Sequence, residues 1–202
     1  MVRVGVLGLQ GDVLEHVQML EGIEGAEPVV VKRREDLEGV DALIIPGGES
    51  TTIGRLIELH GLREPIVELA ERGVPVLGTC AGAVLLAKRA RDREVGSVEQ
   101  PLLALMDIAV LRNAFGRQRE SFEATVELEG LGPVRAAFIR APVIEEAWGR
   151  ARIAARLRHP ALGEVAVAAV QDNLVAVSFH TEVTGDDKLH RMLVDMAKGR
   201  SF

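Results

Sequence analysis

The sequence has one cysteine, one tryptophan, no tyrosine and no long hydrophobic run. Its single cysteine, Cys80, excludes an internal disulfide framework and a cysteine-rich metal site. The first segment is apolar for only about eight residues before glycine and aspartate interrupt it, which is too short for a signal peptide or a membrane span. Positive charge is also limited, because 24 Lys and Arg stand against 30 Asp and Glu and give a formal net charge of −6. This balance argues against nucleic acid or an anionic membrane as the main partner.

Apolar side chains are abundant, since 48% of the 202 residues are hydrophobic and 27% are charged. Such a composition supports a sizeable buried core, and the length suits one domain better than two. We therefore expect residues 1–202 to form a single domain of a cytoplasmic protein.

The first half of the chain alternates short apolar strands with helical patterns. The expected strands are Val2–Leu9, Val29–Lys32, Ala42–Ile45 and Val74–Gly78. The expected helices are Val13–Glu21, Ile53–Leu59, Pro65–Arg72 and Val84–Arg89. Strands separated by helices of this length predict a parallel sheet that is covered on both faces.

The second half is richer in strands, which are expected at Ile108–Leu111, Ala124–Leu128, Val134–Ile139, Val165–Val170 and Leu174–Ser178. Their close spacing predicts that part of this region pairs antiparallel. Asp187–Lys198 has apolar residues on one helical face and predicts a closing helix. Arg91–Gln100 and Ala141–Arg150 are expected to be surface loops. Together the two halves predict one α/β domain.

The most informative segment is Gly78-Thr79-Cys80-Ala81-Gly82, which follows an apolar strand and precedes a helix. This form and context are typical of a nucleophile elbow, in which a sharp turn projects the central side chain from the sheet edge. A helix N-terminus there favours a thiolate and offers free N–H groups for an oxyanion. The alternative is a buried structural thiol, which is a common fate of a lone cysteine.

A thiol nucleophile needs a base, and His180 ends the apolar run Val175–Phe179. Glu182 follows two residues later, where a carboxylate can orient the imidazole and stabilise its protonated form. The other histidines are weaker candidates, because they lie in helical patterns, at a helix end or before a proline: His16, His60, His159 and His190.

Two further loops follow predicted strands. Pro46–Thr51 contains consecutive glycines, whose conformational freedom allows an N–H to point into a cleft. The alternative is a simple turn in which Ser50 or Thr51 caps the following helix. Arg112–Arg119 is basic and can bind a carboxylate or phosphate through an arginine fork, and Arg140 offers a similar choice at the end of another strand. The alternative for Arg112–Arg119 is a solvated loop.

Gly5, Gly8 and Gly11 do not form a dinucleotide-binding motif. Their spacing lacks the close first pair of glycines, and Val29–Lys32 ends without an acidic residue. A phosphate-binding P-loop is absent too, and no histidine or carboxylate cluster has metal-ligand spacing. The sequence therefore predicts neither a Rossmann cofactor nor a metal.

These segments together resemble the class I (triad) glutamine amidotransferase family, and within it the glutaminase subunits of pyridoxal 5′-phosphate synthases. The matching segments run through nearly the whole chain: Gly5–Gly11, Pro46–Thr52, Gly78–Gly82, Arg112–Gln118, Ser121–Glu123, Phe138–Pro142 and Ser178–His180. The resemblance implies a three-layer, flavodoxin-like α/β fold, with a mostly parallel sheet, some antiparallel strands and helices on both faces.

The resemblance also implies roles for particular residues. Cys80 is the expected nucleophile, His180 the general base and acid, and Glu182 the residue that orients it. The residues expected to bind L-glutamine are Gly48, Glu49, Ser50, Arg112, Ile139 and Arg140, and backbone N–H groups of Gly48 and Ala81 are expected to hold the oxyanion. One departure is Thr181, which stands where the family usually has a proline and which lacks proline's fixed φ.

The implied activity is hydrolysis of L-glutamine to glutamate and ammonia, without a cofactor or metal at this site. The implied partner is the synthase subunit of a hetero-oligomeric complex, which uses the ammonia to make pyridoxal 5′-phosphate. Three alternatives stay open: the glutaminase subunit of another amidotransferase complex, a free hydrolase of the same architecture, or a non-enzymatic binding module in which Cys80 is structural.

Overall fold

Two strand systems make up the β-structure of residues 1–97 and 99–200, the part of the chain described by the structure, a computed structural model. The strands are β1 (Val2–Leu7), β2 (Ala26–Val31), β3 (Ala42–Ile45), β4 (Val76–Thr79), β5 (Ala87–Asp92), β6 (Gly96–Ser97), β7 (Met106–Arg112), β8 (Phe122–Leu128), β9 (Gly132–Phe138), β10 (Val143–Ala147), β11 (Arg152–His159), β12 (Gly163–Gln171) and β13 (Leu174–Val177). The main sheet has the order β2-β1-β3-β4-β13-β12-β10-β7-β5-β6, and β11 pairs with β12 outside this path. β8 and β9 form a separate antiparallel hairpin.

Five neighbouring strands of the main sheet, β2, β1, β3, β4 and β13, run parallel. Their carboxyl ends therefore meet at one edge, where open α/β sheets bind ligands. The segments that leave this edge after β3, β4 and β13 are the glycine loop, the Cys80 turn and the His180 segment. Beyond β13 the sheet contains antiparallel pairs of β12 with β13, β10 and β11.

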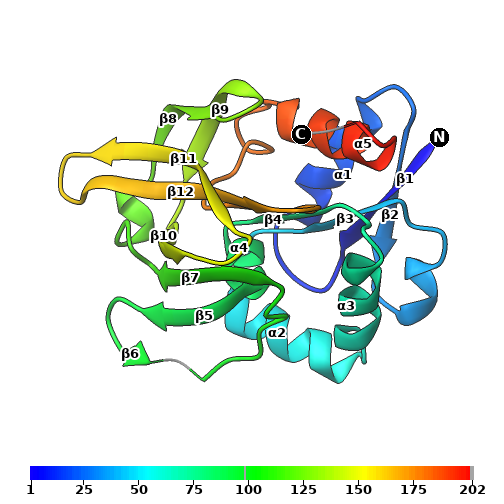
Figure 1. The fold of residues 1–202 in the computed structure, drawn as a ribbon, viewed down its shortest axis with the longest axis horizontal. Coiled ribbons are helices and arrows are strands. Elements are labelled where there is room, and N and C mark those ends of the chain that lie inside the picture. Colours follow the sequence, from blue (N-terminus) through cyan, green and yellow to red (C-terminus); the bar gives the residue numbers. More distant parts are fainter. Residues whose placement is uncertain (98, 201–202) are drawn as a thin grey trace.

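The helices are α1 (Val13–Glu21), α2 (Ser50–Leu59), α3 (Arg63–Glu71), α4 (Ala81–Leu86) and α5 (Lys188–Ala197), with 3-10 turns at Arg34–Leu37 and Gln118–Glu120. α1 and α5 cover one face of the parallel strands, and α2, α3 and α4 cover the other (Figure 1). None of these helices, within the described residues, is long and apolar enough to cross a membrane.

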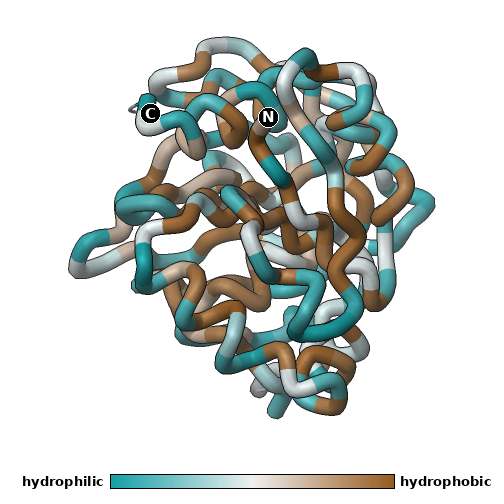
Figure 2. Tube along the Cα trace, turned by 90° about the vertical axis from the view of Figure 1, so that its right-hand side faces the viewer, coloured by the Kyte–Doolittle hydropathy of each residue, from teal (hydrophilic) through white to brown (hydrophobic). Residues whose placement is uncertain are grey.

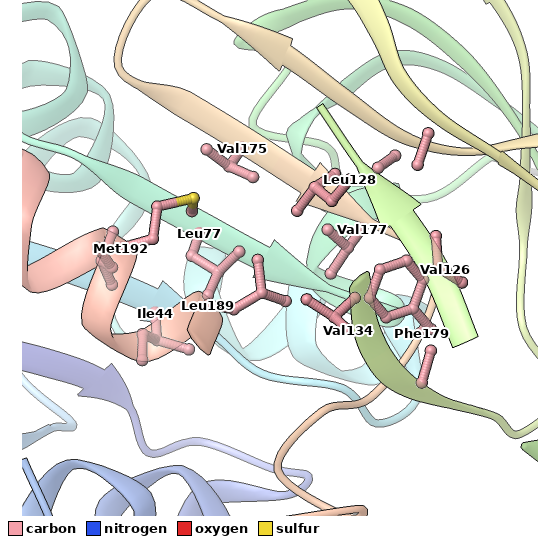
Figure 3. Packing of buried hydrophobic residues seen from close by; sticks show 14 of the residues in the cluster. Ile44, Leu77, Val126, Leu128, Val134, Val175, Val177, Phe179, Leu189 and Met192 are labelled. Carbon is pink, nitrogen blue, oxygen red and sulfur yellow. The ribbon is translucent and has the colours of Figure 1, made fainter. Parts of the chain in front are cut away.

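The core is divided by the sheet into two layers. On one side Leu189 and Met192 of α5 pack with Ile44 and Leu77 of the sheet, and the β8–β9 hairpin closes the far end of this layer (Figure 3). The second layer contains the apolar faces of α2, α3 and α4. Apolar segments accordingly run through the middle of the molecule, and hydrophilic segments lie on its outer turns (Figure 2).

The predicted fold class is confirmed, including helices on both faces and antiparallel strands in the second half. Ala42–Ile45 and Val13–Glu21 have the predicted bounds, and the bounds of most other predicted elements differ by three residues or fewer. The strands that the sequence did not reveal are β5, β6, β10 and β11, and the two short 3-10 turns were not predicted either.

The predicted helix Val84–Arg89 is partly wrong, because α4 ends at Leu86 and the next residues enter β5. β5 pairs parallel with β7, so long-range pairing overrides a weak local helical pattern. The expected loop Ala141–Arg150 contains β10, which pairs antiparallel with β7. The expected loop Arg91–Gln100 contains the end of β5 and β6, and its residue 98 lies outside the described residues.

Candidate active site

Cys80 lies in a strained turn between the end of β4 and the start of α4. Its φ of 49° and ψ of −102° are rare for a residue with a side chain and cost about 1–3 kcal/mol. The Cys80 amide donates to the carbonyl of Val177 over 2.8 Å, which ties the turn to β13. The side chain of Cys80 is mostly buried, but it lines an open cavity of about 400 Å³. This is the geometry expected of a nucleophile elbow.

Two glycines beside Cys80 allow α4 to pack directly on the sheet. A Cβ atom on Gly82 would lie 2.0 Å from the carbonyl oxygen of Ile45 in β3, and one on Gly78 would lie 2.6 Å from the carbonyl carbon of Gly82. Because both contacts are with backbone atoms, they cannot be relieved by a change of side-chain rotamer. The glycines that flank Cys80 therefore set the position of the turn.

His180 leaves β13, the strand beside β4, and lines the same cavity as Cys80. Its backbone exchanges two hydrogen bonds of 2.9 Å with Ala137 at the end of the β8–β9 hairpin. The Nδ1 atom of His180 lies 2.6 Å from Oε1 of Glu182. The predicted base and its orienting carboxylate are thus in hydrogen-bond contact, and the base faces the cavity that contains the thiol.

The charges of this group follow from its surroundings. The side chain of Glu182 is fully buried, and burial alone would raise its pKa. The hydrogen bond to His180 and the charges of His16 and His180 outweigh burial and lower the pKa of Glu182 to about 2. An ionised carboxylate can only accept a hydrogen bond, so Nδ1 of His180 carries the proton that it shares with Glu182.

The pKa of His180 moves in the opposite direction. Burial alone would lower it, but hydrogen bonds with Asp12, Cys80 and Glu182 raise it well above its usual value. The carboxylate of Asp12 is close to the His180 ring, with its Oδ2 atom 3.2 Å from Nδ1. The surroundings of His180 therefore favour an imidazolium, the partner that a thiolate needs.

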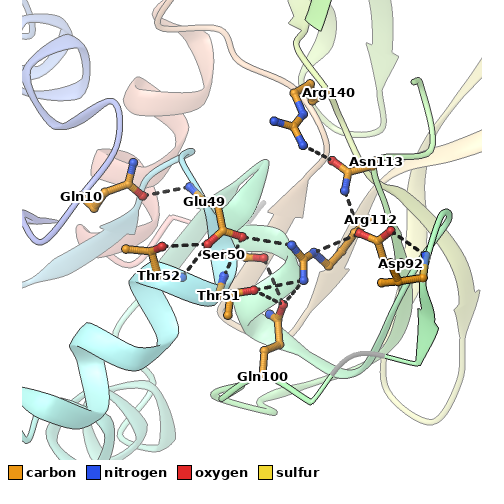
Figure 4. A network of polar contacts seen from close by, with 11 residues as sticks. Gln10, Glu49, Ser50, Thr51, Thr52, Asp92, Gln100, Arg112, Asn113 and Arg140 are labelled. Carbon is orange, nitrogen blue, oxygen red and sulfur yellow. Dashed lines mark hydrogen bonds and ion pairs between the residues drawn. The ribbon is translucent and has the colours of Figure 1, made fainter. Parts of the chain in front are cut away.

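A polar network forms part of the cavity wall (Figure 4). The Arg112 guanidinium donates to Oε1 of Glu49 over 3.0 Å, and it also contacts the side chains of Thr51 and Gln100. Burial alone would raise the pKa of Glu49, but hydrogen bonds from Thr52 and Thr51 and the charge of Arg112 lower it. This wall therefore holds an ordered pair of opposite charges.

The glycine loop after β3 is held close to this network. The Glu49 amide donates to Oε1 of Gln10 over 2.9 Å, and Gly48 has a φ of +152° that few other residues adopt. Ala81 is the first residue of α4, so its amide has no acceptor within the helix. Gly48 and Ala81 both line the cavity that contains Cys80.

The structure brings nearly all of the predicted site residues to one cavity, which is lined by Gly48, Glu49, Ser50, Cys80, Ala81, Arg112, Ile139, Arg140 and His180. Glu182 lies behind His180 and does not line it. Ile139 contributes its carbonyl, 4.0 Å from the Cys80 sulfur. Arg140 has a φ of 48° and places its guanidinium 3.4 Å from Oδ1 of Asn113.

Three polar residues of this region were not found from the sequence: Asp12, Gln100 and Asp92. Asp92 accepts from the side chain of Asn113, and Gln100 accepts from Arg112, so both support the basic wall. The segments that contain Asp92 and Gln100 are polar but have no sequence motif that predicts a site. Asp12 comes just before a helix, where aspartate is common as a cap, and this ordinary explanation hid its position beside His180.

Asp12, His180 and Glu182 also bring their ligand atoms within 4.8 Å of one another, a spacing that can hold a metal ion. Nδ1 of His180 is already within 2.6 Å of Glu182, which is a hydrogen-bond distance. A metal ion would have to displace this shared proton. The geometry is therefore that of a hydrogen-bonded group.

Comparison with known proteins agrees with this geometry. The model of the SNO glutamine amidotransferase family matches residues 6–198. A curated relative from Hyperthermus butylicus, pyridoxal 5′-phosphate synthase subunit PdxT, is 66% identical over 100% of both chains. The subunit of the same name from Pyrobaculum aerophilum is 52% identical over 98% of this chain and 100% of its own.

Comparison with solved structures supports the same family. A crystal structure of a glutamine amidotransferase superposes with a TM-score of 0.84 at 46% identity and covers 96% of this chain and 98% of its own. PurLQS from Thermotoga maritima shares the fold alone, with a TM-score of 0.64 at 16% identity and coverage of 96% and 98%. The family expected from the motifs is thus confirmed, and the chain belongs to the SNO glutamine amidotransferase family.

Proposed function

We propose that this chain is the glutaminase subunit of a pyridoxal 5′-phosphate synthase, and that residues 1–202 form its glutaminase domain. The observation that supports this most strongly is the group of Cys80, His180 and Glu182 at the carboxyl edge of the sheet, in a chain 66% identical to a subunit of that name. The substrate is L-glutamine, and the products are L-glutamate and ammonia.

Catalysis begins when the thiolate of Cys80 attacks the side-chain amide carbonyl of glutamine. His180 accepts the thiol proton, and Glu182 stabilises the resulting imidazolium through the shared proton on Nδ1. The carbonyl oxygen becomes an anion, which the amides of Gly48 and Ala81 hold. Removing one such donor typically costs about 100-fold or more in kcat.

The tetrahedral intermediate then loses ammonia. His180 protonates the departing nitrogen, because an unprotonated amide anion is too poor a leaving group. This leaves a γ-glutamyl thioester on Cys80. The neutral imidazole next takes a proton from water, the hydroxide attacks the thioester, and glutamate is released with the thiol restored.

The polar wall of the cavity binds the amino-acid end of glutamine. Arg112 and Arg140 supply positive charge for the α-carboxylate, and Glu49 supplies negative charge for the α-ammonium group. Ser50 and the backbone of Ile139 complete this side of the cavity. Because Glu49 and Arg112 already contact each other, little side-chain entropy remains to be lost when glutamine binds.

The ammonia passes to a synthase subunit that builds the pyridoxal 5′-phosphate ring. The support for this partner is the name of the full-length relatives, which are subunits of pyridoxal 5′-phosphate synthases. The amidotransferase and its synthase then form one hetero-oligomeric complex, and the chain acts in vitamin B6 biosynthesis.

The test is glutamate release from L-glutamine, measured with and without the synthase subunit, for the wild-type chain and for Cys80→Ala. We expect activity that increases when the synthase is added and that disappears in the variant. Strong activity that does not respond to the synthase would instead indicate another amidotransferase or a free hydrolase. No activity in either mixture would favour a binding module.

A further inference from the structure

Asp12 occupies a helix-capping position without capping the helix. It is the N-cap residue of α1, and aspartate at this position usually accepts a hydrogen bond from an amide of the first turn. The Asp12 side chain makes no such bond. Its amide donates instead to the carbonyl of Gly47 over 3.1 Å, which fixes Asp12 against the glycine loop. The carboxylate is thereby turned away from its own helix.

The carboxylate of Asp12 points toward the base of the proposed triad. Its Oδ2 atom lies 3.2 Å from Nδ1 of His180, and Oε1 of Glu182 lies 2.6 Å from the same atom. Two carboxylates therefore lie within ion-pair distance of one ring nitrogen, and the shorter contact, with Glu182, is a hydrogen bond. Glu182 is fully buried, whereas Asp12 is about one-third exposed and lines the cavity.

Gly47 provides the space for this arrangement. A Cβ atom at this position would lie 2.3 Å from Cε1 of His180 and 2.7 Å from Oδ2 of Asp12. The φ of Gly47 lies outside the left-handed region, so its backbone conformation does not require glycine. The absence of a side chain at Gly47 is thus explained by the contact between the imidazole and the carboxylate.

We propose that Asp12 is a positioning residue for His180, a second carboxylate that holds the imidazole from the cavity side and stabilises its charged form during glutamine hydrolysis. The inference rests on the glutaminase function proposed above. Glu182 contacts the ring from the protein interior and Asp12 contacts it from the solvent side, so the ring lies between two carboxylates from different segments.

The titratable groups around His180 come from four segments. Glu182 follows it in the same segment, Asp12 precedes α1, Cys80 precedes α4, and His16 lies on α1. His16 is buried, and burial lowers its pKa. Asp12 is therefore the acidic neighbour of His180 that can be changed without opening the buried core.

The test compares Asp12→Asn with Glu15→Gln, a matched loss of one negative charge on the exposed side of the same helix. The full chain is labelled with ¹³C-histidine, and the His180 signal is identified by its loss in His180→Asn. We expect the titration midpoint of His180 to fall in Asp12→Asn and to stay at the wild-type position in Glu15→Gln. Asp12→Ala should give the same direction of change, which excludes an effect of the asparagine amide.

Kinetics give the second readout. In Asp12→Asn the alkaline limb of the kcat/KM profile should move to lower pH, with a loss of about tenfold on that limb and a smaller loss near neutral pH. An unchanged His180 midpoint, or a loss of activity that is uniform with pH, would overturn the proposal. If the wild-type chain releases no glutamate either with or without the synthase subunit, the glutaminase function fails, and the histidine titration still decides whether Asp12 acts on His180.

Discussion

Replacing Gly82 by alanine tests whether the cost of packing exceeds the gain in helix propensity at the turn that contains Cys80. Alanine in a helix is normally about 1 kcal/mol more favourable than glycine. At Gly82 the added Cβ would lie 2.0 Å from the carbonyl oxygen of Ile45, whereas ordinary contact begins at 3.4 Å. The helix and β3 must therefore move apart, and we expect the packing cost to exceed the gain in propensity.

The magnitude follows from the nature of the contact. Overpacking in a close-packed core costs about 1–3 kcal/mol, and a clash with backbone lies near the upper value because no rotamer relieves it. After the propensity gain of about 1 kcal/mol, the net loss in the free energy of unfolding is about 2 kcal/mol. For a chain of this length that corresponds to a decrease in Tm of about 4–8 °C. Cys80 is two residues away, and a displacement of about 1 Å typically costs about 100-fold in rate.

The assay is thermal unfolding together with glutamate release, with Gly22→Ala as the matched control. Gly22 ends α1 with a φ of −79°, and a Cβ there would meet its nearest atom at 3.4 Å, an ordinary contact. We expect this control to be neutral or more stable by about 0.4–1 kcal/mol, with normal activity. A Gly82→Ala variant that is as stable and as active as the wild type would refute the packing argument.

Three further predictions concern the site and its buried support. Arg112→Lys loses the planar fork that contacts Glu49, so KM for glutamine should rise about tenfold with a smaller change in kcat, and an unchanged KM would remove Arg112 from substrate binding. Glu182→Gln should lower kcat by about 100-fold or more because the imidazolium loses its buried counter-charge, and a variant within twofold of wild-type kcat, about the uncertainty of such measurements, would contradict this. Burial, aided by the charge of His16, lowers the pKa of His190 to about 4, so between pH 6.5 and 4 the unfolded chain binds a proton that the folded chain does not. The free energy of unfolding should therefore fall by roughly 3 kcal/mol as pH decreases through this window, and urea denaturation of His190→Gln, which keeps a donor for His16, should show a flatter dependence.

The parallel half of the fold was predictable because its signals are local. Ala42–Ile45 is a continuous apolar run that proline and glycine end, and its predicted bounds match those of β3. β5 has no such signal, since Ala-Lys-Arg-Ala-Arg-Asp is largely charged. It is a strand because it pairs with β7 and because Arg89 and Arg91 form ion pairs with Glu146 and Glu145 of β10. This information is not local, because the pairing strand is a separate segment and the two glutamates lie more than 50 residues away.

The site was predictable to a similar extent. Cys80 and the glycine loop come from the carboxyl ends of neighbouring parallel strands, so the predicted sheet alone places them at one edge. His16 and His190 were weak candidates for catalysis, and the structure places them in a buried hydrogen-bonded pair behind Glu182. The sequence gives no sign of this pair, because its members are far apart along the chain and lie on different helices.

The position of Cys80 depends on the distance between α4 and the sheet more than on side-chain packing. Gly78 and Gly82 flank Cys80, Gly47 lies beside His180, and each would place a Cβ within 2.6 Å of another segment. None of them has a left-handed φ, so their role is contact and not backbone freedom. Two of these contacts join α4 to the sheet and one joins the glycine loop to His180. The contacts at Gly78 and Gly82 are with backbone atoms, which cannot adapt as side chains do. A small increase in the distance between α4 and the sheet would therefore move the thiol away from the imidazole and reduce catalysis before it unfolds the domain.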